Sequence, residues 1–206
     1  VLPLAHNIRT RQTVRSPPAL VPYDPAWPEH AHRIIARIQT ACGTKALRID
    51  HIGSTAVPGM DAKDVIDIQV TVPSLAVADE IAEALAEVGY PRKAHITSDI
   101  PKADARSTVS KFDHTSDPSL WQKRFHAAAD PGRLANVHLR VDGWPGQQFA
   151  LLFTNWLEAN PGVRDDYVAA KRAALAARDY AEAKEPWFLD AHRRAWEWAD
   201  TTGWRP

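Results

Sequence analysis

The residues best suited to chemistry lie in one stretch, where a glycine–serine turn is followed by a strand that carries a carboxylate. Gly53 has no Cβ, so the backbone can approach an anion closely there. The Ser54 and Thr55 hydroxyls, with the N–H groups of the turn, are suited to hold a phosphate. Asp67 lies on the polar side of the alternating segment 65–72, where it can bind a cation that accompanies a nucleotide phosphate. We therefore expect a phosphate site at the turn, with Asp67 as a catalytic residue and as the ligand of Mg²⁺.

A second group of polar residues lies much further along the chain. His138 and Arg140 alternate with apolar residues in the segment 134–141, so they occupy one face of a strand. We expect His138 to act in catalysis as a proton acceptor, or as a ligand of metal or phosphate. Arg140 and Lys184 are expected to neutralise phosphate charge.

Each of these residues also has a structural interpretation. A Gly-Ser pair often only makes a turn, and Asp67 can form a structural ion pair with Arg140. Lys184 can simply precede a helix, and His51 lies near the turn; for these two residues the structural interpretation is slightly favoured. The functional interpretation is favoured for Ser54 and Asp67, because they belong to one motif.

The acidic residues are too few for ordinary two-metal nucleotidyl transfer, in which two cations clamp the phosphoryl group. Gln69 stands two residues after Asp67, where a second carboxylate is needed, and it is neutral. The loss of an anionic ligand weakens Mg²⁺ binding, because this hard cation prefers charged oxygen. The missing second carboxylate therefore makes nucleotidyl transfer a weaker expectation, but it does not argue against ligand binding.

Alternating and helical patterns predict the elements that position these residues. One helix ends near Ala41, before Gly43, and a second covers 74–88. Polar loops cover 99–105 and 113–120. The cluster Asp113, His114 and Asp117 is more consistent with a solvated turn than with a metal site, because its spacing matches no known ligand class. The remaining predicted elements are the strands 46–52, 65–72 and 134–141, weak strands near 93–98 and 106–112, and helices over 145–159, 163–178 and 186–199.

The run Gly53–Gly59, followed by Lys63 and by Val65–Ile68, resembles the GrpB-like family of the nucleotidyltransferase superfamily. Asn136–Arg140 and Tyr180–Lys184 resemble two further signatures of that family, and the likeness covers roughly residues 20–190. The resemblance implies an α/β (α+β) fold with a nucleotidyltransferase-like mixed sheet, flanking helices and a helical C-terminal part. It also implies that the strand of His138 lies beside that of Asp67, so that their polar faces line one site.

The chain departs from the family and superfamily patterns at two places. His138 stands where the superfamily usually has a third acid. Thr154-Asn155-Trp156 replaces a segment in which the family more often carries an arginine near the site. Both departures further reduce the expectation of nucleotidyl transfer.

The opening segment Val1–Asn7 is similar to the segment that joins the kinase and GrpB-like halves of actinobacterial dephospho-CoA kinases. Because the chain starts at Val1 and residues 1–22 are rich in proline, we expect a linker or tail there, a domain over 23–206, and a longer or processed parent chain. The expected partner is an N-terminal kinase domain of the same chain. The sequence contains no Gly-x-x-x-x-Gly-Lys-Ser/Thr loop, so kinase chemistry is not expected of these residues.

Two functions from different classes remain open at this point. The first is an accessory GrpB-like domain of a dephospho-CoA kinase in coenzyme A biosynthesis, which assists folding or regulation and binds a nucleotide or CoA-type ligand. The second is an active Mg²⁺-dependent nucleotidyltransferase that uses Gly53, Ser54 and Asp67. A nucleic-acid-binding module is the weakest alternative, because 25 basic residues are balanced by 25 acidic ones.

Composition sets broad limits on the chain. The hydrophobic content of 45% over 206 residues is enough for a packed core. The single cysteine, Cys42, excludes an intrachain disulfide and fits a reducing compartment, and we expect an inert core thiol. No apolar run reaches membrane-spanning length, so we expect a cytoplasmic protein without a membrane partner.

Overall fold

The computed structural model describes residues 19–99, 117–130, 133–177 and 180–206. The predicted strand 106–112, the residues Asp113 and His114, and most of the predicted tail lie outside these ranges. Val21, at the end of that tail, pairs with Ala62 and packs against the core. The elements in chain order are α1 (Trp27–Cys42), β1 (Arg48–Ile52), β2 (Ile66–Val72), α2 (Leu75–Glu80), α3 (Ala82–Glu87), β3 (Arg124–Asp130), β4 (Arg133–Val141), α4 (Pro145–Ala159), α5 (Pro161–Ala174), α6 (Tyr180–Ala183) and α7 (Glu185–Thr202).

The sheet is mixed, with the strand order β1-β2-β4-β3. β2 and β4 are parallel, and the two outer pairs are antiparallel. The β2–β4 register places Asp67 opposite Asn136 and Gln69 opposite His138. Residues paired across a ladder point to the same face of a sheet. The predicted adjacency of the two polar strand faces is therefore confirmed.

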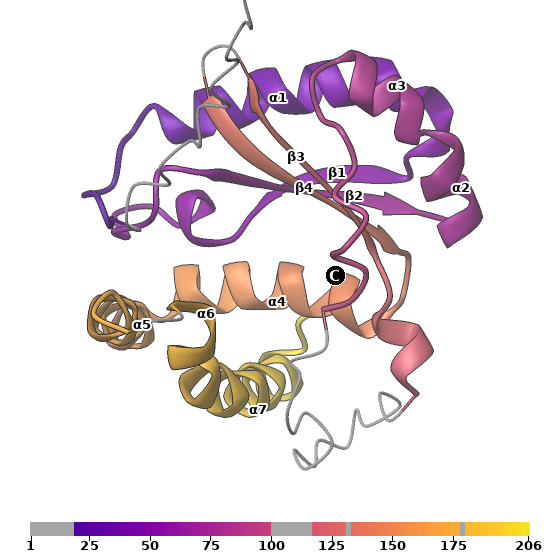
Figure 1. The fold of residues 1–206 in the computed structure, drawn as a ribbon. Helices are drawn as coiled ribbons and strands as arrows, with labels where there is room; N and C mark the ends of the chain where they lie inside the picture. Colours follow the sequence, from indigo (N-terminus) through magenta and orange to yellow (C-terminus); the bar gives the residue numbers. More distant parts are fainter. Residues whose placement is uncertain (1–18, 100–116, 131–132, 178–179) are drawn as a thin grey trace, which may run out of the picture.

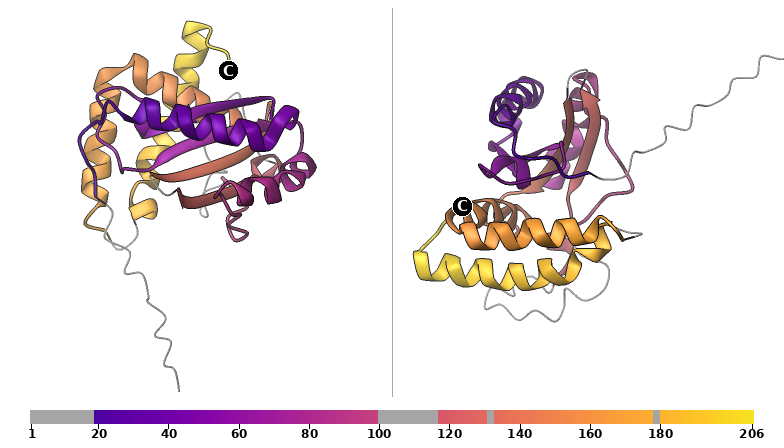
Figure 2. Two further views of the ribbon diagram at one scale, coloured as in Figure 1. Left: turned by 90° about the horizontal axis from the view of Figure 1, so that it is seen from above. Right: turned by 90° about the vertical axis from the view of Figure 1, so that its left-hand side faces the viewer.

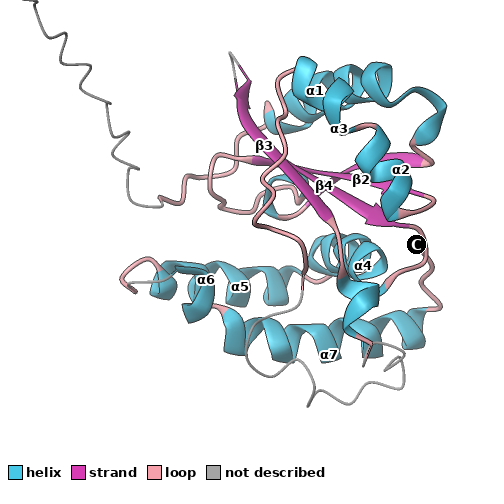
Figure 3. Ribbon diagram, turned by 45° about the vertical axis from the view of Figure 1, so that its right-hand side comes forward, coloured by secondary structure: helices cyan, strands magenta, loops and turns pink. Residues whose placement is uncertain are grey.

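Helices cover the two faces of the sheet differently. Figure 1 shows α1 and α3 on one side of the sheet and α4 to α7 on the other, with α4 nearest the strands. Figure 2 shows from two further directions that the C-terminal helices form a layer of their own. Figure 3 shows the same separation of the sheet from α5 and α7. No helix among the described residues combines the length and the apolar character that a membrane span needs.

Two apolar clusters hold these layers together. The first joins α1 to the apolar face of the sheet and includes Ile38, Ile66 and Leu139. The second lies among the C-terminal helices and also takes in Val57 and Met60 from the loop between β1 and β2. The turn that carries Ser54 is thereby anchored in the helical layer through its own apolar residues.

Several elements differ from the prediction. The helix expected over 74–88 is interrupted at Ile81. Of its apolar stripe, Ile81 and Leu85 are buried, and Val77 and Val88 are partly buried. The segment near 93–98 is not a strand: it meets the sheet only through isolated bridges and backbone hydrogen bonds. β3 was not predicted, because it is poor in β-branched residues and exists by pairing with β4. The short helix α6 was also not predicted.

Candidate functional site

Asp67 presents one oxygen to the Gly53 turn. Its Oδ1 accepts a hydrogen bond of 2.8 Å from Asn136 Nδ2, and His138 Nε2 lies 3.5 Å from the same oxygen. Its Oδ2 faces the turn: a Cβ added to Gly53 would stand 3.0 Å from it. Gly53 has φ +74°, a conformation that residues with a side chain rarely adopt. Only glycine fits this approach, and the predicted proximity of turn and carboxylate is confirmed.

The Ser54 turn is fixed by helices from the C-terminal half. Gly53 N–H donates to Thr154 Oγ1 on α4 at 3.0 Å, so this amide is already occupied. Ser54 Oγ accepts from Lys171 Nζ on α5 at 3.3 Å, and the Tyr167 hydroxyl of the same helix is a neighbour of Ser54. The Ser54 hydroxyl therefore lies where the loop between β1 and β2 meets α5.

Thr55 and His51 lie on the other side of the turn. Thr55 is buried, and its hydroxyl is 2.9 Å from His51 Nε2. His51 pairs with Ile68, so it belongs to the sheet face opposite Asp67. Burial lowers the pKa of His51 to about 4, with Asp67 acting weakly in the other direction. This placement fits the structural interpretation of His51, whereas the phosphate-binding role of Thr55 stays a prediction.

His138 is held between two cations and a carboxylate. Lys123 Nζ and Arg140 Nη2 lie 3.3 Å and 3.2 Å from His138 Nδ1. Lysine and arginine can only donate, so Nδ1 is the acceptor and Nε2 carries the proton that points to Asp67. Burial and the neighbouring Arg140 charge lower the pKa of His138 to about 4. The neutral ring is thus suited to orient Asp67, and a role as proton acceptor stays a prediction.

Arg140 does not form the structural ion pair with Asp67 that was considered as an alternative. Its guanidinium donates to both oxygens of Asp99, at 2.7 Å and 2.9 Å, and to Gln69 Oε1 at 2.8 Å. Lys123 also donates to Asp99. Burial tends to raise the pKa of Asp99, but these two cations outweigh it and hold the pKa well below its usual range. Arg140 is buried and engaged in this network, and its role toward phosphate stays a prediction.

Asp67 is the residue that best fits a metal or a donor group of a ligand. Burial acts to raise its pKa, but the hydrogen bonds from His138 and Asn136 outweigh this and lower it, so the carboxylate is ionised. Gln69 is fully buried and donates to Gln147 O at 3.1 Å, so it offers nothing to a cation. Within the described ranges no group of three or more acidic, histidine or cysteine residues is arranged to hold a metal. Asp67 would thus hold Mg²⁺ through one oxygen, with water or ligand oxygens completing the shell.

Three lysines surround the Ser54 side of the site. Lys171 is buried beneath Ser54, and burial together with Lys184 lowers its pKa to about 7. Burial and the nearby Lys63 charge lower the pKa of Lys184 to about 8, whereas Asp67 acts to raise it. The Lys63 and Lys184 ammonium groups lie 3.4 Å and 4.4 Å from the centroid of the Tyr180 ring. Positive charge is therefore concentrated beside the Asp67 carboxylate.

A protein-family model described as GrpB protein matches residues 17–194. The chain belongs to the GrpB family. The fold class predicted from the sequence, an α/β fold with a mixed sheet, flanking helices and a helical C-terminal part, is confirmed.

Curated relatives place this GrpB region within longer proteins. It is 61% identical over 214 residues to a dephospho-CoA kinase of Mycolicibacterium paratuberculosis, spanning all of this chain and 53% of the kinase. It is 30% identical over 181 residues to UPF0157 protein BH1888 of Halalkalibacterium halodurans, covering 85% of this chain and 81% of that protein. The chain thus spans about half the length of the kinases that it matches.

A solved structure supports the fold independently. The conserved protein GrpB from Enterococcus faecalis matches with a TM-score of 0.66 and 22% identity, over 86% of this chain and 96% of that one. At 22% identity, this similarity shows that the two chains share a fold.

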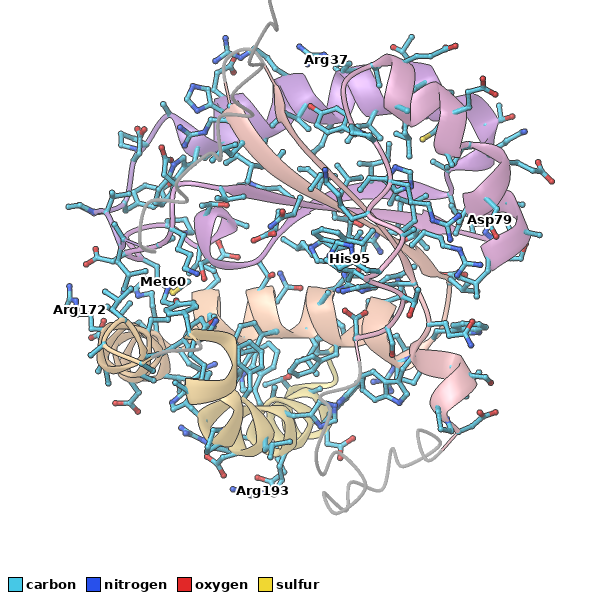
Figure 4. The ribbon with its side chains drawn as sticks, viewed as in Figure 1. Arg37, Met60, Asp79, His95, Arg172 and Arg193 are labelled. Atoms are coloured by element: carbon cyan, nitrogen blue, oxygen red, sulfur yellow. The ribbon has the colours of Figure 1, made fainter. Side chains whose placement is uncertain are left out.

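Several residues of the candidate site were not predicted from the sequence. Lys171 and Tyr167 lie on an amphipathic helix, where their spacing resembles that of any half-buried face. Asp99 lies in a segment without regular structure, so no periodicity pointed to it. Figure 4 shows Met60 and Arg172 near the end of α5, where the loop between β1 and β2 meets that helix.

The site is distinct from a cavity at the end of α7. That cavity has a volume of about 230 Å³ and is lined by residues that include Trp196, Asp200 and Trp204. No predicted site residue lines it. The Cys42 thiol is buried in the first apolar cluster, and burial raises its pKa to about 11, which fits an inert core thiol.

Proposed function

We propose that this GrpB chain is the accessory, non-kinase part of a dephospho-CoA kinase and that it binds a phosphorylated ligand of nucleotide or CoA type. The ligand would lie beside the Ser54 turn, with its phosphate near Lys184 and a cation or hydroxyl at Asp67 Oδ2. The kinase relatives and the match of this chain to half of their length support the accessory role. The lysines beside an ionised carboxylate support ligand binding.

One observation favours binding over transfer. Asp67 lacks a second carboxylate at the position two residues later, because a buried glutamine stands there. The other acids near this face are paired with cations: Asp50 with Arg48, and Asp99 with Arg140 and Lys123. Two-metal transfer needs paired carboxylates that bridge both cations. A single oxygen at Asp67 is sufficient to orient one Mg²⁺ on a bound phosphate.

Calorimetry with ADP, ATP and CoA, with and without Mg²⁺, tests ligand binding. We expect at least one ligand to bind, with an affinity that falls about tenfold or more in Asp67→Asn when Mg²⁺ is present. Asp142→Asn, at an exposed position after β4, serves as the matched control and should leave the affinity unchanged. The absence of binding by every ligand, or equal affinity in Asp67→Asn, would contradict this part of the proposal.

The accessory role is tested in the parent kinase. The full-length chain and a version that ends before this region are compared for soluble yield and for phosphorylation of dephospho-CoA. We expect lower yield or lower activity in the shortened chain. Equal yield and equal activity of both chains would count against an accessory role.

The second candidate, an active Mg²⁺-dependent nucleotidyltransferase, is favoured by Asp67 Oδ2, which faces the Gly53 turn and is suited to a cation. Incubation with NTPs labelled at the α-phosphate, followed by analysis of protein and small-molecule products, detects such transfer. Label transfer that is lost in Asp67→Asn would establish this second function.

A further inference from the structure

Three separate segments of the chain each bring a lysine to the same place. Lys63 lies in the loop before β2, Lys171 lies on α5, and Lys184 lies between α6 and α7. The Lys63 and Lys184 ammonium groups share the ring of Tyr180. Lys171 Nζ lies 4.7 Å from the centroid of the Tyr167 ring and contacts Ser54. The three positive charges raise one another's energy, and a bound anion would offset this repulsion.

The buried member of this group lacks an anionic partner among the described residues. Lys171 is 2% exposed, and its ammonium donates to Ser54 Oγ and to the backbone oxygen of Asp61, which are both neutral. The Asp61 carboxylate is paired with Arg172 instead. A buried ammonium usually requires an opposite charge.

We propose that Lys63, Lys171 and Lys184 form a cradle for a diphosphate or triphosphate chain. The inference rests on the proposed function and names the class of ligand for that site. A single phosphate monoester carries about two negative charges near neutral pH, whereas a diphosphate or triphosphate chain carries more and spans more than one ammonium group. Nucleoside di- and triphosphates and ligands with an internal diphosphate belong to this class.

Protons are expected to accompany binding. Lys171 faces Lys184, Arg172 and Asp61, and Lys184 faces Lys63 and Asp67. Burial and the repulsion among the lysines depress the pKa values of Lys171 and Lys184, to about 7 and about 8. A bound polyphosphate reverses the sign of the local potential and raises both values, so the protein takes up protons from solution.

Calorimetry with inorganic phosphate, pyrophosphate and tripolyphosphate tests the cradle without a nucleoside. We expect pyrophosphate and tripolyphosphate to bind about tenfold or more tightly than phosphate. At a pH of about 7.5, the heat should differ between two buffers of unequal ionisation enthalpy in the direction of proton uptake.

Variants at the two half-buried lysines identify the site. Lys63→Ala and Lys184→Ala should each weaken pyrophosphate binding about tenfold, with unchanged circular dichroism. Lys45→Ala, at an exposed lysine paired with Glu80, is the matched control and should have no effect. Equal affinity for phosphate and pyrophosphate, or full affinity in both site variants, would overturn the cradle.

The lysine and Asp67 variants together distinguish failure of the cradle from failure of the proposed ligand-binding function. Nucleotide or CoA binding that depends on Asp67 but is unaffected in Lys63→Ala and Lys184→Ala would reject the cradle alone. The absence of binding by nucleotides, CoA and polyphosphates would reject both proposals.

Discussion

At the scale of single residues, the site depends on how closely Gly53 approaches Asp67. Gly53→Ala would force a side chain into a conformation with φ +74° and place its Cβ 3.0 Å from Asp67 Oδ2. We expect a loss of about 1–3 kcal/mol in the free energy of unfolding from backbone strain, together with loss of ligand affinity. Urea denaturation and calorimetry measure these two effects.

Gly43→Ala is the matched control for this substitution. Gly43 also has a positive φ, of +56°, but nothing lies within 4 Å of an added Cβ. The control should therefore lose stability through strain and keep its ligand affinity. Equal affinity in the two variants would show that the contact between Gly53 and Asp67 is unimportant for binding.

The sequence predicted the residues of this site unevenly. Gly53, Ser54 and Asp67 were found because they form a contiguous motif whose spacing reflects a turn and a strand. Lys171 was missed because a buried lysine on a helix has the same local pattern as an exposed one. Its burial depends on the packing of α5 against the β1–β2 loop, which no local pattern encodes.

At the scale of elements, the alternating pattern predicted β1, β2 and β4 well, because each strand has one apolar face packed in the first apolar cluster. β3 and the 91–99 segment were not predicted correctly, because their structure comes from pairing with neighbours rather than from their own residues. Lys93 N–H and Asp99 N–H donate to Phe125 O and Trp121 O along this edge. The side chain of Asp99 adds the link from that segment to β4.

Asp99→Ala should release this segment from the polar face of the sheet. The substitution leaves Arg140 and Lys123 buried without their carboxylate, and we expect a loss of about 3–5 kcal/mol in the free energy of unfolding. Asp79→Ala is the control, because Asp79 also binds two cationic side chains, Arg92 and Arg124, but is exposed. Urea denaturation should show a loss of no more than about 1 kcal/mol for the control. Similar losses in the two variants would contradict the special role of the buried network.

At the scale of the whole molecule, the two apolar clusters have different relations to the site. The first supports the sheet from the α1 side, whereas the second contains the loop that carries Ser54 and the helix that carries Lys171. The site therefore exists only where the sheet and the C-terminal helical layer are joined. Disturbing the second cluster should affect ligand binding more than an equal disturbance of the first.

Met60→Ala and Ile38→Ala test this difference, because both side chains are fully buried, one in each cluster. Each substitution should cost about 2–5 kcal/mol in the free energy of unfolding, because each leaves a cavity in a packed core. Under conditions in which both variants remain folded, Met60→Ala should also speed amide hydrogen exchange at Ser54 and weaken pyrophosphate binding. Ile38→Ala should bind as the unmodified chain does, because its cavity opens on the far side of the sheet. If both variants bind pyrophosphate equally well, the position of the Ser54 turn does not depend on the packing of the second cluster. The predicted coupling between the helical layer and the site would then be contradicted.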